Sequence, residues 1–142
     1  MNVIVPVDGS KHSSKAIDYL ITHASMFNGK GSSITLLNVQ PDVIPPEVTQ
    51  YIPKKSINEW YEDQSKVAVK LAIQKLDKAN IKYKLVKKVG NVAETILKEA
   101  KTSKADMIVM GSHGRSSLMN LIMGSIATQV LSQAKQPVLI VK

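Results

Sequence analysis

Cysteine is absent from the 142-residue sequence, arginine occurs once, at Arg115, and aromatic residues make up only 4% of the chain. The lack of cysteine excludes a disulfide scaffold, a thiolate nucleophile and a Cys-ligated zinc site, and it suits a cytoplasmic, reducing environment. Specialised nucleic-acid modules read base edges with arginine and stack bases on aromatic rings, so this composition argues against such a module. No apolar run approaches the ~18 residues of a membrane span, and the start does not resemble a signal peptide.

Charge is the unusual quantity that is present. The chain has 19 Lys and Arg against 11 Asp and Glu, a formal net charge of +8, and its pI is about 9.7. This balance is compatible with nucleic acid, an anionic surface or a small anionic ligand. Ten of the 19 cations lie between Lys54 and Lys88, where lysines most simply solvate a surface. Nonspecific binding of nucleic acid stays an alternative.

Length and a hydrophobic fraction of 44% predict one globular domain over residues 1–142. Short β-branched runs alternate with segments whose apolar residues recur at helical spacing. Strands are expected at residues 2–7, 33–39, 82–89, 107–110 and 138–141, with Pro6 on the last rung of the first because proline lacks a ladder donor. Helices are expected from Ser13, over residues 57–79, after a capping motif at Asn91, and over residues 125–134.

The segment from Gln40 to Ser56 contains four of the six prolines and has no clean period. Connections of this length are uncommon in small domains and are either functional flaps or mobile. The long helix after it is expected to be amphipathic, with Trp60 in the core or in an interface. The expected core face consists of Trp60, Val67, Ala68, Leu71, Ala72 and Leu76.

Alternating strands and helices predict a parallel sheet, because helices supply the crossovers that parallel neighbours need. The strands are almost continuously apolar, as expected when helices cover both faces. Right-handed crossovers bring every strand-to-helix loop to one edge of the sheet. In such doubly wound α/β folds, ligands bind at that edge, where the winding reverses.

The loop after the fourth strand has the composition of a phosphate-binding loop. Gly111, Gly114 and Gly124 allow a positive φ or a close approach of the backbone to a ligand, and amides at a helix N-terminus attract anions. Arg115 can bind a phosphate through two N–H groups. Hydroxyl donors are available at Ser112, Ser116, Ser117 and Ser125. The alternative is that these glycines only turn the chain.

Other chemical motifs are missing from the sequence. There is no Walker loop, no G-x-G-x-x-G after the first strand and no G-x-S-x-G elbow. His12, His23 and His113 have no carboxylate at a spacing suited to a metal site or a triad. His113 is therefore expected to be a hydrogen-bond donor of the loop and not a catalytic base.

The spacing Gly111-x2-Gly114-x9-Gly124-Ser125 resembles the G-2x-G-9x-G-(S/T) signature of the ATP-binding branch of the universal stress protein family. The segments VPVDGS, GNVAE and PVLIV, at residues 5–10, 90–94 and 137–141, are also similar to that family, and the resemblance covers essentially the whole chain. It implies a five-stranded sheet in the order 3-2-1-4-5 with helices on both faces, like the adenine nucleotide alpha hydrolases. Asp8 would then face the glycine loop across one crevice.

The resemblance also implies an ATP site. The Val39 backbone would contact the adenine edge, and Met110 would pack beside the base or ribose. Asp8 would serve the ribose, the base or a Mg²⁺ ion, although an Asp after a strand also commonly sets a turn or caps a helix. The implied site residues are Pro6, Val7, Asp8, Val39, Met110, Gly111, His113, Gly114, Arg115, Gly124, Ser125 and Ile126.

The expected function is that of an ATP-binding regulatory or stress-response protein with at most slow hydrolysis, since the parts used for rapid phosphoryl transfer are missing. The alternative is a nucleotide α-hydrolase or adenylyltransferase, which would need a further glycine-serine loop after the first strand. The last strand, Val138–Val141, would form an apolar sheet edge that needs a cover. A homodimer through this edge, as in the family, is therefore expected.

Overall fold

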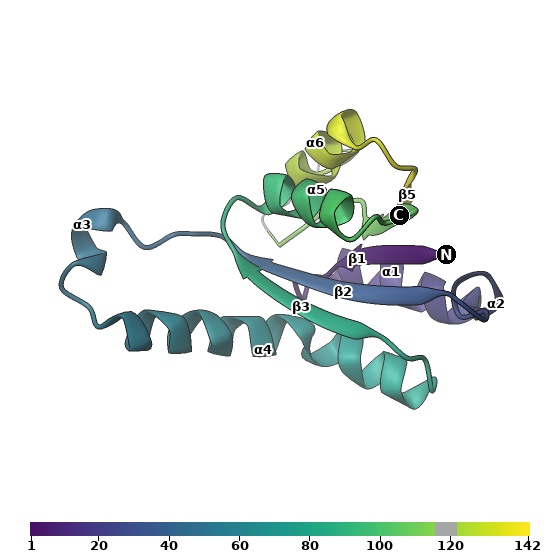
Figure 1. Ribbon diagram of the computed structural model, residues 1–142, viewed down its shortest axis with the longest axis horizontal. Coiled ribbons are helices and arrows are strands. Elements are labelled where there is room, and N and C mark those ends of the chain that lie inside the picture. Colours follow the sequence, from purple (N-terminus) through teal and green to yellow (C-terminus); the bar gives the residue numbers. More distant parts are fainter. Residues whose placement is uncertain (116–121) are drawn as a thin grey trace.

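The computed structural model describes residues 1–115 and 122–142 and contains one parallel sheet in the order β3-β2-β1-β4-β5 (Figure 1). The strands are β1 (Asn2–Pro6), β2 (Ser33–Gln40), β3 (Lys84–Val89), β4 (Met107–Gly111) and β5 (Val138–Val141). The helices are α1 (Lys11–Thr22), α2 (Ala24–Phe27), α3 (Pro46–Thr49), α4 (Lys54–Lys78), α5 (Val92–Thr102) and α6 (Ser125–Gln133). The predicted α/β fold and its strand order are confirmed, while Ser116 and Ser117 lie outside the described residues.

Helices cover both faces of the sheet, with α1 and α4 on one face and α5 and α6 on the other (Figure 1). Neighbouring residues of β1 point to opposite faces, so Val3 and Val5 pack with α1 and α4, whereas Ile4 packs with α5 and α6. All three side chains are fully buried. The two-sided burial explains why the strands are apolar without alternation.

Two helices at the ligand edge of the sheet begin with side-chain caps. The Ser10 hydroxyl accepts a hydrogen bond from the Ser13 N–H at 3.1 Å and caps α1. The Asn91 Oδ1 accepts one from the Glu94 N–H at 3.0 Å and caps α5, as predicted. Each cap satisfies a backbone donor that would otherwise lack a partner in the first turn.

The core face of α4 differs from the prediction. Trp60, Val67 and Leu71 are 43%, 75% and 47% exposed. The buried residues of α4 are Tyr61, Ser65, Ala68, Val69, Ala72 and Leu76. The helix carries two apolar stripes, and the one with small side chains faces the molecule because it allows a close approach: a Cβ on Gly9 would lie 3.2 Å from the Ala68 Cα. None of the described helices, α4 included, is both long and apolar enough to cross a membrane.

The proline-rich segment before α4 contains one short helix, α3, that its sequence did not predict. Together with the first half of α4, this segment projects beyond the sheet (Figure 1). The Tyr61 phenol ties its beginning to α4, because it accepts a hydrogen bond from the Val43 N–H at 3.3 Å and donates one to Asp42 Oδ1 at 3.1 Å.

Candidate functional site

The candidate site lies where β1 separates from its neighbours. Its pairing with β2 ends at Pro6 and Leu37, and its pairing with β4 ends at Ile4 and Ile108. The Val7 N–H still donates to the Leu37 carbonyl at 2.9 Å. Because alternate residues of a strand direct their backbone groups to the same side, the N–H and C=O of Val39 face the crevice beyond this last bond.

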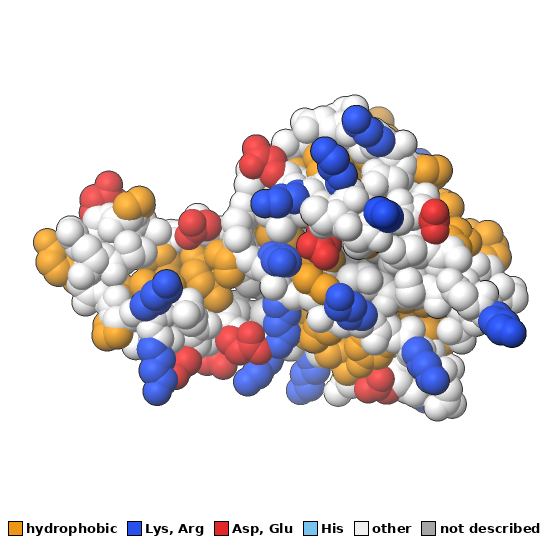
Figure 2. Space-filling view, viewed as in Figure 1, with side chains coloured by type: hydrophobic (Ala, Val, Ile, Leu, Met, Phe, Trp, Pro, Cys, Tyr) orange, Lys and Arg blue, Asp and Glu red, His pale blue; other side chains and the backbone are white. Residues whose placement is uncertain are grey.

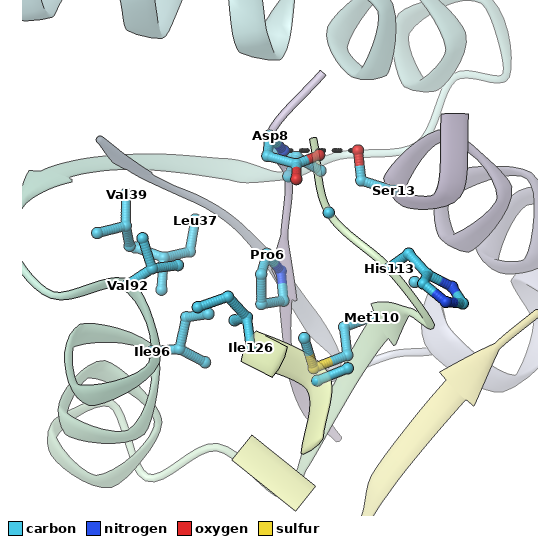
Figure 3. Close-up of a pocket in the computed structure, with 14 residues that line it drawn as sticks. Pro6, Asp8, Ser13, Leu37, Val39, Val92, Ile96, Met110, His113 and Ile126 are labelled. Atoms are coloured by element: carbon cyan, nitrogen blue, oxygen red, sulfur yellow. Dashed lines mark hydrogen bonds between the residues drawn. The ribbon is translucent and has the colours of Figure 1, made fainter. Parts of the chain in front are cut away.

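The inner part of the crevice is an apolar slot (Figure 3). Figure 3 shows Val39 and Val92 at one end of the slot, Met110 at the other, and Pro6 and Ile126 between them. Its lining residues are Pro6, Val7, Asp8, Ser13, Leu37, Val39, Val92, Ile96, Met110, Gly111, His113, Gly114, Ile126 and Ala127. Such a slot suits a flat apolar ring whose edge carries hydrogen-bonding groups.

The slot continues into an outer cleft that has more polar walls. Asp8, Val39, Val92, Gly114 and Ile126 line both parts, so the two form one continuous site. The cleft adds Pro41, Asp42, Gly90, Asn91 and Arg115. A ligand that fills both parts therefore needs an apolar end and a polar end.

Asp8 bridges the two loops that border the crevice. Its Oδ1 accepts a hydrogen bond from the Ser10 N–H at 2.8 Å, and its Oδ2 accepts one from the Arg115 N–H at 3.1 Å. The predicted juxtaposition of Asp8 and the glycine loop is thus confirmed. The side-chain cap of α1 is supplied by Ser10 and not by Asp8, so the carboxylate sets the turn and fixes the start of the loop.

The three loop glycines are needed for close contacts. Among the glycines, positive φ angles occur at Gly9 (81°), Gly31 (82°) and Gly90 (152°). The loop glycines Gly111, Gly114 and Gly124 do not have the positive φ that was one of the two expected reasons for glycine there. A Cβ on Gly111 would lie 2.5 Å from the His12 backbone; on Gly114, 2.9 Å from Asp8 Oδ2; and on Gly124, 3.1 Å from the His113 Cα. The loop therefore packs its backbone directly against α1 and against itself.

The N-terminus of α6 follows the glycine loop. Gly124 is its N-cap and supplies no side-chain hydrogen bond. The Gly124 N–H donates to the Ser112 carbonyl at 2.7 Å, which fixes the start of the helix beside the loop. Ile126 reaches the slot, whereas Gly124 and Ser125 do not line it. The first-turn amides of α6 and its partial positive charge suit a phosphate.

The imidazole of His113 points away from the apolar side chains of the slot and toward α1 (Figure 3). Its ring centroid lies 4.7 Å from that of His12, and its Nδ1 lies 2.9 Å from the Ser112 Oγ. The Nδ1 of His12 is buried without a hydrogen-bond partner among the described residues. Burial lowers the pKa of His12, and the charges of His113, Lys15 and Lys11 lower it further.

Of the predicted residues, Gly124 and Ser125 lie outside both parts of the site, and Arg115 lines only the cleft. Sequence reasoning missed Leu37 and the pair Val92 and Ile96. Leu37 could have been found from strand alternation with Val39, and the pair from its helical spacing. In residues 1–115 and 122–142, no group of three or more His, Asp or Glu side chains is placed to hold a metal ion.

The fold and site define a doubly wound α/β protein with a ligand slot at the point where the sheet reverses its winding. The model of the Universal stress protein family matches residues 1–142, the whole chain. The chain therefore belongs to the universal stress protein family.

Individual relatives agree with this assignment. Universal stress protein MJ0531 of Methanocaldococcus jannaschii is 30% identical over 141 residues, which cover 99% of this chain and 81% of that protein. The solved structure of MJ0577 from the same organism has a TM-score of 0.83 at 25% identity and covers 99% of this chain and 94% of that one. A family member from Arabidopsis thaliana with AMP bound has a TM-score of 0.70 at 18% identity, with 100% and 91% coverage.

Proposed function

We propose that this chain binds an adenine nucleotide, with ATP as the physiological ligand, and acts as a nucleotide-dependent regulatory protein in a stress response. The observation that carries the proposal is the backbone edge of Val39, which lies beyond the last β1–β2 pair and beside an apolar slot. The amino group and ring nitrogen on the adenine edge match a backbone C=O and N–H, while Pro6, Met110 and Ile126 offer apolar contacts to the ring. The AMP complex of the Arabidopsis relative supports an adenylate.

The phosphates would extend along the outer cleft toward the glycine loop and the first turn of α6. Arg115 lines that cleft, is exposed, and would bind a phosphate through its guanidinium. Asp8 would bind the ribose, or a Mg²⁺ ion coordinated by the phosphates, since its oxygens already accept two N–H groups but keep further lone pairs. Hydrolysis would be slow, because the histidine of the loop directs its ring away from the slot.

Calorimetric titration with ATP, ADP, AMP and GTP tests the proposal. We expect the adenine nucleotides to bind and GTP to bind at least about tenfold more weakly, because a site that pairs with the adenine edge leaves groups unpaired against guanine. Gly114→Val should abolish binding by placing a side chain at the junction of slot and cleft. Gly29→Ala is the matched control, because its Cβ would meet only the Ser32 Oγ at 3.8 Å.

Equal affinity of Gly114→Val and wild type for ATP would contradict the site. Incubation with ATP tests the slow chemistry separately. Release of ADP and phosphate at a low rate agrees with the proposal, whereas rapid release of AMP and pyrophosphate would instead indicate a nucleotide-processing enzyme.

We also propose that the chain forms a homodimer through β5. The two edges of the sheet differ in their protection: β3 carries Lys84, Lys87 and Lys88, whereas Val138–Val141 of β5 is uncharged and only half-buried. Lysines discourage edge-to-edge pairing, and an apolar edge without them invites it. The Arabidopsis and MJ0577 structures support the common fold of such a protomer.

A further inference from the structure

The outward stripe of α4 has the spacing of a helix-pairing seam. Ile57, Trp60, Gln64, Val67, Leu71 and Gln74 follow one another at alternating intervals of three and four residues. This is the a/d pattern of a heptad repeat, sustained over most of the helix. The stripe is separate from the residues that α4 buries, and Trp60, Val67 and Leu71 are 43%, 75% and 47% exposed.

We propose that this seam, defined as residues 57, 60, 64, 67, 71 and 74, packs against the same seam of a second copy of the chain in antiparallel orientation. The proposal goes beyond nucleotide binding and does not depend on it. The residues of the slot and of the outer cleft come from β1, β2, β4, α1, α5, α6 and the adjoining loops, and none comes from α4. Pairing through α4 therefore leaves the nucleotide site open.

One register matches the whole seam. In antiparallel helix pairs, an a residue of one helix meets a d residue of the other. Trp60 then packs on Leu71 of the second copy, and Gln64 on its Val67. The two-fold axis of this register passes between residues 65 and 66, almost at the middle of the 25-residue helix Lys54–Lys78, so the two helices overlap along their full length. Gln64 is a polar residue within the seam, a feature that restricts register.

The charges beside the seam favour the antiparallel orientation. Asp63 and Lys70 flank it on one side, are exposed, and take part in none of the ion pairs found in the described part of the chain. The antiparallel register brings Asp63 next to Lys70 of the second copy, twice per dimer. A parallel pair would place Lys70 beside Lys75 of the second copy, which repels it and is already bound to Asp18 at 2.7 Å.

These charge pairs are solvent-exposed, so they set orientation more than affinity. The affinity would come from the apolar side chains, above all Trp60, whose indole also packs on Tyr61 with ring centroids 5.0 Å apart. Large aromatic residues of this kind are common anchors of interfaces. Because β5 lies at the sheet edge opposite to β3, the seam and the β5 edge can be used at the same time.

Disulfide trapping tests the register directly, because the natural chain has no cysteine. Residues 57 and 74, the outer pair of this register, are about 26 Å apart along one helix, at 1.5 Å per residue, so they cannot be bridged within a chain. In the antiparallel dimer each lies beside the other residue of the second copy. We expect the double variant Ile57→Cys/Gln74→Cys, which keeps Trp60 and Leu71, to form a covalent dimer on mild oxidation, and each single variant not to. A parallel pair would instead link the single variants, which would overturn the proposal, as would an unlinked double variant.

Charge reversal on the full chain gives a second, independent measurement. Asp63→Lys and Lys70→Asp should each weaken association by roughly fivefold to tenfold at low salt, as expected for close charge pairs, and the double variant should restore it. Lys66→Asp, on the same helix but off the seam, is the matched control and should change nothing. Failure of the double variant to restore the light-scattering mass would overturn the proposal. The affinity of the same variants for ATP should be unchanged. Loss of ATP binding would therefore contradict the proposed nucleotide site and not the proposed pairing of α4.

Discussion

At the scale of single residues, the glycines of the loop after β4 differ in what a side chain would meet. At Gly111 the added Cβ would lie 2.5 Å from two backbone atoms of His12, which cannot move without shifting α1. At Gly114 it would meet only the end of the Asp8 side chain, at 2.9 Å. Overpacking against a fixed backbone costs about 1–3 kcal/mol, and often more when the backbone must shift.

We therefore predict that Gly111→Ala lowers the free energy of unfolding by at least about 2 kcal/mol, while Gly114→Ala lowers it by less. Urea denaturation followed by circular dichroism measures both. Gly29→Ala, with no contact closer than 3.8 Å, is the control and should be neutral or slightly stabilising. Equal stability of the Gly111 and Gly29 variants would show that the loop does not pack against α1 as described.

His12 makes the stability dependent on pH. Its pKa lies below the ordinary value of 6.5, first because of burial and then because of the positive charges of His113, Lys15 and Lys11, with Asp8 acting in the opposite direction. The unfolded chain thus binds more protons than the folded chain once the pH falls below about 6.5, and the free energy of unfolding decreases with falling pH. The stability that depends on a neutral His12 is fully present above pH 6.5. It is lost as the pH falls through the lower pKa that His12 has in the folded protein.

The corresponding measurement is urea denaturation of wild type and His12→Asn at several values between about pH 5 and pH 8. We predict that the variant loses less stability than wild type on acidification. It lacks the partly buried imidazole, which in wild type must take up a proton close to other positive charges. Parallel pH profiles for the two proteins would mean that His12 is not buried in solution as described.

At the scale of elements, α5 depends on its N-cap. Asn91 accepts a hydrogen bond from the Glu94 N–H at 3.0 Å and also lines the outer cleft. Asn91→Ala should lower the free energy of unfolding by about 1 kcal/mol and weaken nucleotide binding by loosening Val92 in the slot. Asn91→Asp keeps a capping oxygen and should retain the stability. A stable Asn91→Ala variant would contradict the role of the cap.

The strands were predicted from the sequence more successfully than the helices. β1, β2 and β4 were predictable because each is a short apolar run that is buried on both sides, which removes any ambiguity of face. The edge strands β3 and β5 were predictable from their position between helical segments, although they are only partly buried. The core face of α4 was not, because Trp60, Val67 and Leu71 form a second apolar stripe at helical spacing, and periodicity alone does not say which stripe meets the sheet. The short helix α3 was missed because proline suppresses the pattern by which helices are recognised.

The site was predicted best where the chain itself brings residues together. The glycine spacing identified Gly111 and Gly114, and the order of the strands placed Asp8 opposite them, as the 3.1 Å bond to the Arg115 N–H confirms. Leu37 and Ile96 were missed because their part in the slot depends on how β2 and α5 cross, which is set by packing. The close contact of Gly111 with His12 depends in the same way on the position of α1.

At the scale of the whole molecule, the positive charges are spread over the surface, and some of them are paired. Lys55, Lys75, Lys87 and Lys88 each pair with a carboxylate. Lysines are distributed over the visible face among acidic residues instead of forming one basic groove (Figure 2). A polynucleotide requires a continuous track of unpaired cations. The distribution on this face therefore favours a small anionic ligand over a nucleic acid.

The proposed dimer through β5 can be tested by a substitution that removes an outward-facing N–H of this strand. The hydrogen bonds that β5 makes with β4 then stay in place. The carbonyls of Pro137 and Val141 accept hydrogen bonds from Ile108 and Ser112 of the β4 side, so Val138, between them in alternation, directs its N–H outward. Val138→Pro removes that outward donor while proline stays tolerable at the first residue of an edge strand.

We predict that Val138→Pro lowers the light-scattering mass at least about twofold relative to wild type at the same micromolar concentration and leaves ATP affinity unchanged. If α4 pairs as proposed, the mass must halve again when Val67→Glu and Leu71→Glu are added, ending at the 15.5 kDa of one chain. Each change removes one interface, so either change alone should leave a dimer through the other, because the surfaces lie on separate elements and share no residue. A wild-type protein that already has the mass of one chain would exclude both surfaces. If either change alone lowers the mass to that of one chain, the two surfaces are not used at the same time.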